Sequence, residues 1–299
     1  MDQIYANVFA TMLIDCRQQM IPMVNEMHGT DYSMEDKVVL SNEEHYLKNS
    51  EELEKRVSDG HFSVQREDEQ EHYHFECQTR QDPGMPKRMA EYELPIALEH
   101  SEVEGNAVKV RLPSAAVLQL QCSRNMPDEY KIQISTSEGE VVHKVRIMKL
   151  NRYSVKDILE KGLYLLIPYH ILVYKKRFSE YNKDERKLAG LIKVYEDILA
   201  GLEEAMEQGR INGHAVYTII VMSRHIIKHV TAGYDRIRER LGEIMGGVVL
   251  DNPARAIFAN GKIEGKIEAY ISLIRDGIIS MAEAAKRLGM KEEEVRQYL

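Results

Sequence analysis

The spacing of hydrophobic and polar residues changes along the chain and divides it into regions of different secondary structure. Near the N-terminus, apolar residues recur at intervals typical of an α-helix, which predicts a helix over residues 3–27 with a kink at Pro22. Residues 34–57 are acidic and weakly patterned. We expect this second segment to be partly helical and to lie over the core.

From residue 61 the apolar period becomes two, which is typical of strands with one buried face. Residues 61–65 and 73–78 alternate in this way, and the charged residues between them predict a hairpin that turns near residues 67–69. Further strands are predicted over residues 116–121, 130–136 and 140–150, with Ser137-Glu138-Gly139 as the turn between the last two. The middle of the chain therefore forms a sheet.

Helical patterns surround and follow these strands. One helix is predicted over residues 86–100, between the two groups of strands, and another follows Ser154, which suits an N-cap. Two long helices are predicted over residues 183–209 and 216–242. This order of elements indicates an α/β core with a mixed sheet flanked by helices, followed by an α-helical C-terminal region.

The C-terminal tail has the spacing of a helix-turn-helix. Ser280 begins a capping box, Ala285 and Gly289 lie four residues apart, and Val295 follows the glycine by six residues. However, the second helix would open with three glutamates at residues 292–294, which would repel DNA phosphates. We therefore expect the tail to take part in packing or homo-oligomerisation rather than in DNA recognition.

Composition indicates a packed globular protein, with 43% hydrophobic and 29% charged residues. The longest apolar run, residues 162–174, is shorter than the roughly 20 residues that cross a bilayer, and the N-terminus does not resemble a signal peptide. We therefore expect a cytoplasmic protein with no membrane partner. Cys16, Cys77 and Cys122 are odd in number and widely spaced, which predicts free buried thiols.

Charge is distributed unevenly around a formal net value of −8. Residues 141–193 contain 13 basic and 5 acidic residues, whereas residues 41–80 contain 11 acidic and 5 basic residues. The basic stretch is suited to phosphates and the acidic stretch to cations. The alternative for both is a solvated charged surface.

A set of polar side chains falls on one face of the predicted hairpin. Alternation places His74, Glu76 and Gln78 together, and hairpin pairing brings Asp59 close to Glu76. Two such carboxylates are stabilised by a hard cation such as Mg²⁺ or Mn²⁺, and a metal held there can activate water for phosphodiester hydrolysis. The alternative is a strand that merely presents polar residues to solvent.

Three segments give the chain a resemblance to a known family. They are Arg56-Val57-Ser58-Asp59-Gly60, then Phe75-Glu76-Cys77-Gln78, then Asp82-Pro83-Gly84-Met85-Pro86-Lys87-Arg88-Met89-Ala90-Glu91-Tyr92. In order, spacing and flanking residues they resemble the signature of the recombination-promoting nuclease / putative transposase family of the PD-(D/E)XK nuclease superfamily. The similarity continues through Leu112-Pro113-Ser114 to Leu166-Ile167-Pro168-Tyr169 and covers most of residues 1–175.

The resemblance implies a restriction-endonuclease-like core in which Asp59 and Glu76 bind Mg²⁺ or Mn²⁺. It places Gln78 where many relatives have lysine, and a neutral amide can only hydrogen-bond where an ammonium would also stabilise charge. Arg88 and Tyr92, four residues apart on the predicted helix, resemble a Q-x-x-x-Y element and are expected to bind substrate. The alternative for Arg88 is a surface ion pair with Glu91, and the alternative for Tyr92 is a core aromatic side chain.

These observations lead to a magnesium-dependent DNA endonuclease associated with recombination or mobile elements. We expect three regions: a nuclease-like domain (residues 1–175), a helical region (176–260) and the helix-turn-helix-like tail (261–299). The helical C-terminal regions are the expected interface of a homo-oligomer. The rival is a catalytically silent nuclease-fold module that binds nucleic acid or a protein. A third hypothesis is an interaction protein dominated by its helices.

His225 and His229 have zinc-type spacing but no evident third ligand.

Overall fold

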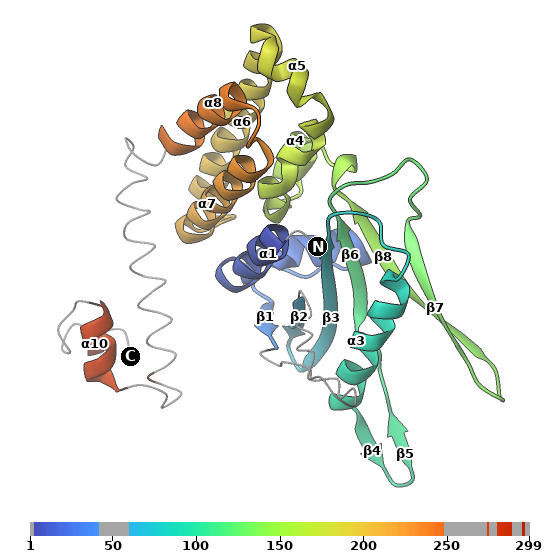
Figure 1. The fold of residues 1–299 in the computed structure, drawn as a ribbon. Helices are drawn as coiled ribbons and strands as arrows, with labels where there is room; N and C mark the ends of the chain where they lie inside the picture. Colours follow the sequence, from blue (N-terminus) through green and yellow to red (C-terminus); the bar gives the residue numbers. More distant parts are fainter. Residues whose placement is uncertain (1–2, 42–59, 248–273, 275–279, 289–294, 297–299) are drawn as a thin grey trace, which may run out of the picture.

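The computed structural model describes residues 3–41, 60–247, 274, 280–288 and 295–296 (Figure 1). Its centre is a six-stranded mixed sheet in the order β1-β2-β3-β6-β8-β7, and β3, β6 and β8 run parallel. The strands are β1 Lys37–Leu40, β2 Gly60–Arg66, β3 Glu69–Gln78, β6 Ser114–Gln119, β7 Glu129–Ser135 and β8 Glu140–Lys149, and β4 Glu102–Glu104 pairs with β5 Ala107–Lys109 in a separate hairpin. The predicted α/β class is confirmed at this level.

The sheet is covered differently on its two faces (Figure 1). Tyr73, Phe75 and Cys77 of β3 point into the main core, which also contains the N-terminal helices α1 Gln3–Asp15 and α2 Met20–His28. The opposite face carries α3 Met85–Glu99 and a smaller apolar cluster that includes Met89 and Val117. The alternation of β3 therefore gives it one apolar and one polar face, both inside the protein.

The C-terminal helices share the main core with the sheet. Buried residues of α6, α7 and α8 belong to the same apolar cluster as those of α1 and β3. The elements of this region are η2 Leu150–Arg152, α4 Val155–Glu160, η3 Tyr164–Arg177, α5 Phe178–Lys183, α6 Glu185–Glu207, α7 Gly213–Val230 and α8 Asp235–Gly247, with α10 Met281–Leu288 in the tail. None of the described helices is long and apolar enough to cross a membrane.

Several sequence predictions are confirmed in detail. The first hairpin turns at Glu67, whose φ of 53° is left-handed, between β2 and β3. The second hairpin joins β7 and β8, and α3 forms despite Pro95. Ser154 caps α4 in a capping box with Asp157.

Three predictions about helices are corrected. The N-terminal helix is interrupted by the 3₁₀ turn η1 Arg17–Gln19, because Cys16 (φ −124°, ψ 28°) leaves the helical conformation before Pro22 is reached. Residues 37–40 of the second segment form edge strand β1, since Lys-Val-Val-Leu is rich in β-branched residues. The predicted helix over residues 216–242 is divided into α7 and α8, with Thr231 as the C-cap of α7.

A matched pair of glycines in α6 tests the packing of α4. A Cβ at Gly201 would lie 3.1 Å from Cγ of Leu159 and closer to both of its methyl groups, whereas one at Gly190 would meet nothing within 4 Å. Gly190→Ala should raise the free energy of unfolding by about 0.5–1 kcal/mol through helix propensity. Gly201→Ala should be less stable than Gly190→Ala by about 1 kcal/mol or more, because Leu159 must move. Equal gains in urea denaturation would contradict this packing.

His170 predicts a pH dependence of stability. Its side chain is buried in η3, and burial lowers its pKa from 6.5 to about 4. The folded state thus favours neutral imidazole, so stability is complete above pH 6.5 and is lost as the pH falls toward 4. The low pKa of His170 should reduce the free energy of unfolding by on the order of 2 kcal/mol as the pH falls from 7 to 5. His170→Phe should reduce the fall in unfolding free energy over that range, and an unchanged fall would contradict the prediction.

Candidate functional site

The polar face of β3 lies beneath α3. His74, Glu76 and Gln78 all point to this side and are 0%, 3% and 6% exposed. The alternative of a strand face open to solvent is therefore wrong for these residues. Burying an acid, an imidazole and an amide side by side is costly unless each finds partners, so their contacts define the chemistry of the site.

Glu76 is held between two cationic side chains. Its Oε1 is 3.3 Å from Nε2 of His74, and its Oε2 is 3.8 Å from Nη2 of Arg88 on the first turn of α3. Arg88 also lies 3.5 Å from Asp82, in the loop before the helix. The helix N-terminus is thus tied to the end of β3 through the Glu76 carboxylate.

His74 separates two buried acids. Its Nδ1 is 3.9 Å from Oε1 of Glu93, which is on α3 and fully buried. Burial lowers the pKa of His74, but hydrogen bonds to Glu76 and Glu93 and the charges of both acids raise it more, to about 9. At neutral pH an imidazolium therefore lies between the carboxylates. Glu93 is in turn 2.6 Å from Nε2 of His143 on β8.

Gln78 ends β3 next to Gln119, its register partner on β6. Nε2 of Gln119 donates to the backbone carbonyls of Gln78 (3.3 Å) and Gln121 (3.1 Å). Nε2 of Gln78 and Oε1 of Gln119 are buried, and neither has a hydrogen-bond partner among the described residues. Each unsatisfied group costs about 1–3 kcal/mol, so a ligand that hydrogen-bonds here would gain affinity.

Lys149 lies at the same edge of the sheet as Gln78 and Gln119. Lys149 ends β8 opposite Gln119 and is 7% exposed. Its ammonium lies 2.8 Å from Oδ1 of Asp128, which also contacts Arg152 at 2.8 Å. The carboxyl ends of three parallel strands thus carry an amide, an amide and an ammonium, at the edge where ligands bind in open α/β sheets.

The structure describes four of the five predicted site residues. Asp59 lies outside the described residues, so its convergence with Glu76 stays a prediction. Arg88 contacts Glu76 rather than Glu91, which is instead 3.8 Å from Lys87. Tyr92 is 7% exposed and packs edge-on against the His74 ring at 5.6 Å.

Sequence reasoning missed Glu93, His143, Gln119 and Lys149. Glu93 could have been found, because it occupies the apolar face of the helix that also carries Met89 and Ile96. His143 and Lys149 share the alternating face of β8 with buried residues, although no short motif distinguishes them. Gln119 follows an apolar run, and its place beside Gln78 depends on the register of β3 and β6.

Oxygen donors and the cationic side chains of His74, Arg88 and Lys149 lie together at this edge. Carboxylate and amide oxygens from Glu76 and Gln119 are ligands that Mg²⁺ accepts. Because His74 and Arg88 already compensate Glu76, a cation bound to this carboxylate would replace the 3.8 Å contact with Arg88. That exchange would leave Asp82, 3.5 Å away, as the remaining carboxylate beside the guanidinium.

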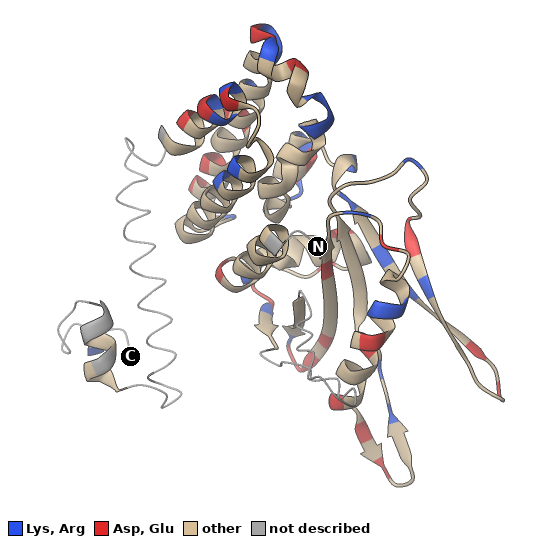
Figure 2. Ribbon diagram, viewed as in Figure 1, with Lys and Arg blue, Asp and Glu red and all other residues tan. Residues whose placement is uncertain are grey.

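Charge elsewhere on the molecule is mostly mixed. Seven of the 13 basic residues within 141–193 form ion pairs, and all of these except the buried Lys149 are exposed. Both signs occur on α5, α6 and α8 (Figure 2). An exception is a cavity of about 470 Å³ between α7 and α8, whose lining includes Arg224, His225, Lys228 and Arg238 and no acid.

Similarity to known proteins adds no further assignment for these residues. No protein-family model matches the chain, and no curated protein or solved structure is significantly similar to it.

Proposed function

We propose that the chain is a metal-dependent endonuclease that hydrolyses phosphodiester bonds in DNA. The convergence of Glu76, Gln78 and Arg88 at the carboxyl end of β3 is the observation that supports it best. Glu76 and Gln78 are buried and Arg88 is partly exposed, so an acid, an amide and a guanidinium lie together where the proposed chemistry needs them. The association with recombination or mobile elements rests on the sequence resemblance alone.

Each residue has a distinct role in this proposal. Asp59 and Glu76 would hold Mg²⁺ or Mn²⁺, which when bound lowers the pKa of a water and polarises the phosphodiester. Gln78 orients the attacking water by hydrogen bonding, as a neutral amide can. Arg88 binds a nonbridging phosphate oxygen, and the ring of Tyr92 keeps His74 in place.

A second candidate is a catalytically silent module that binds nucleic acid. Two observations favour it: position 78 holds no cation, and His74 and Arg88 already compensate the Glu76 carboxylate without a metal. The basic lining of the α7–α8 cavity, with Arg224 and Lys228, would supply phosphate contacts remote from the sheet. The two candidates differ in whether metal and Glu76 are needed for cleavage.

Glu76→Gln should lower Mg²⁺-dependent cleavage of supercoiled plasmid by about a hundredfold or more, the scale of losing one electrostatic contact in an active site. The substitution preserves shape, so circular dichroism should show an unchanged fold. Glu69→Gln is the matched control, because Glu69 is an exposed acid on the same strand. Cleavage by the Glu69 variant should equal that of the parent, and equal cleavage by both variants would remove Glu76 from the site.

Gln78→Lys should maintain or increase cleavage, because an ammonium can stabilise charge on the phosphate where an amide cannot. Gln70→Lys adds the same charge at the exposed start of β3 and should have no effect. Metal affinity must be measured beside the rate, since an ammonium about 4 Å from Glu76 would gain roughly 4 kcal/mol at an effective dielectric of 20 and compete with the cation.

The outcome also separates the two candidates. Activity gained only in the lysine variant, and lost again with Glu76→Gln, would identify a competent site weakened at position 78. If parent and Gln78→Lys both fail to cleave DNA in Mg²⁺ and Mn²⁺, and calorimetry detects no metal binding that depends on Glu76, the endonuclease proposal is rejected in favour of the binding module.

A further inference from the structure

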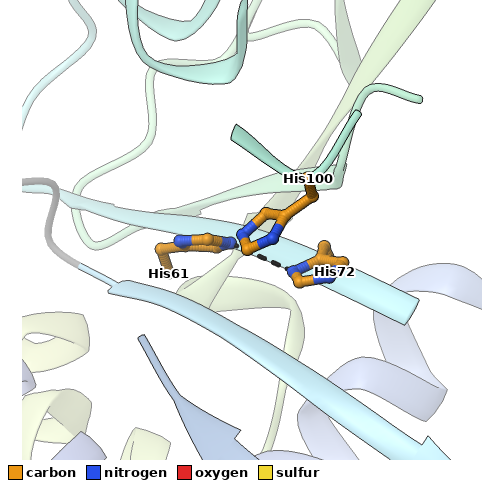
Figure 3. A group of neighbouring side chains, drawn as sticks. All are labelled: His61, His72 and His100. Atoms are coloured by element: carbon orange, nitrogen blue, oxygen red, sulfur yellow. Dashed lines mark hydrogen bonds between the residues drawn. The ribbon is translucent and has the colours of Figure 1, made fainter. Parts of the chain in front are cut away.

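Three histidines converge beside the polar face of β3 (Figure 3). His61 lies on β2, His72 on β3, and His100 is the C-cap of α3. One ligand atom from each lies within 4.8 Å of the others, and this is the only group of three or more such ligands found within the described part of the chain. His61 lies opposite His74 in the strand register, and His74 in turn contacts Glu76.

The strand register produces this convergence. His61 pairs with His74 and Ser63 pairs with His72 across the antiparallel β2–β3 ladder, so His61 and His72 are diagonal neighbours on the face that α3 covers. The helix begins near the carboxyl end of β3 and ends where its capping residue, His100, stacks on His72 with ring centroids 4.0 Å apart. Two strands and a helix end therefore supply one imidazole each.

The spacing of the first two rings matches that of metal ligands. Nε2 of His61 and Nδ1 of His72 are 3.4 Å apart. Zinc–nitrogen bonds of about 2.0–2.1 Å in tetrahedral geometry place two ligand nitrogens roughly 3.3 Å apart. A hydrogen bond between neutral rings would also explain that pair, but it gives no reason for a third histidine over the same point.

The third ring can complete the site by a local rotation. His100 is exposed, and its ring lies nearly parallel to that of His72, with 23° between the planes. Turning its side chain would aim a nitrogen at the point shared by the other two without moving the backbone. Both His72 and His100 also line a cavity of about 390 Å³, which leaves space for a water molecule as a fourth ligand.

Two features of the surroundings suit a borderline-soft cation. Imidazole nitrogens select zinc and its neighbours rather than Mg²⁺. His61 is buried and His72 is half-buried, so two of the three rings are shielded from bulk solvent. The cavity wall also carries Glu71 and Glu102 together with Lys109 and Arg111, and Arg111 is paired with Glu71 at 2.7 Å.

We propose that His61, His72 and His100 form a Zn²⁺ site whose fourth position is open to water. The bound ion ties the end of α3 to the β2–β3 hairpin, and so fixes the helix that covers Glu76. The site does not require the proposed nuclease activity, because its ligands are nitrogens and none of them belongs to the proposed nuclease site.

Zinc and cobalt titrations of the full chain, after removal of metal by a chelator, test the site. The parent should bind one Zn²⁺ per chain that His100→Ala and His72→Ala bind more than about tenfold more weakly, because losing even an outer-shell partner costs that much. Bound Co²⁺ should show the visible absorption of a tetrahedral site. His225→Ala, which removes an exposed histidine of α7, should bind as the parent does.

Two further variants make the outcome decisive. His61→Asn should also lose binding while keeping its circular dichroism spectrum, and unchanged affinity in this variant would mean a two-histidine surface contact and overturn the proposal. Glu76→Gln should retain full zinc affinity. Loss of zinc with Glu76→Gln but not with His100→Ala would place the ion at the acidic end instead and would equally reject the three-histidine site.

Discussion

The structure depends on burying charged groups between the sheet and α3. Glu76 and Glu93 are 3% and 0% exposed, and each would destabilise the fold if left without a cation. His74 lies between them and is protonated at neutral pH by their combined influence. The position of α3 on the sheet is therefore fixed by complementary charge as well as by the apolar contacts of Met89. A helix held in this way cannot slide along β3 without separating a carboxylate from its partner.

This arrangement has opposite consequences for the two candidate functions. A compensated carboxylate is stable without metal, as a binding module requires. A metal-dependent enzyme needs the same carboxylate to exchange Arg88 for a cation, and the exchange is feasible because the 3.8 Å contact is longer than a hydrogen bond. The amide atoms of Gln78 and Gln119 that have no partner among the described residues lie on the same polar face, where a ligand would supply them with hydrogen bonds.

Local patterns predicted much of this fold and only part of the site. Alternation identified β3 and its polar face, and Ser154 identified the start of α4, because these features depend on neighbouring residues. The boundary between α7 and α8 was missed, since the apolar period continues across Thr231. Glu93 and His143 meet only because α3 crosses to β8, and His61, His72 and His100 meet only through strand register and helix length. A single sequence does not encode such distances in any short motif.

The polar face of β3 thus presents different donors at its two ends. Carboxylate and amide groups lie near Gln78 and Gln119 together with cationic side chains, whereas imidazole nitrogens gather around His72, and hard and borderline-soft cations discriminate between such donors. Because α3 runs from Arg88 at one end to His100 at the other, its placement links the two. A metal at the histidine end would hold the helix terminus, and a rigid helix would transmit that restraint to Arg88 without contact between the sites. The charge network at His74 lies along this helix and holds α3 against β3 through Glu93.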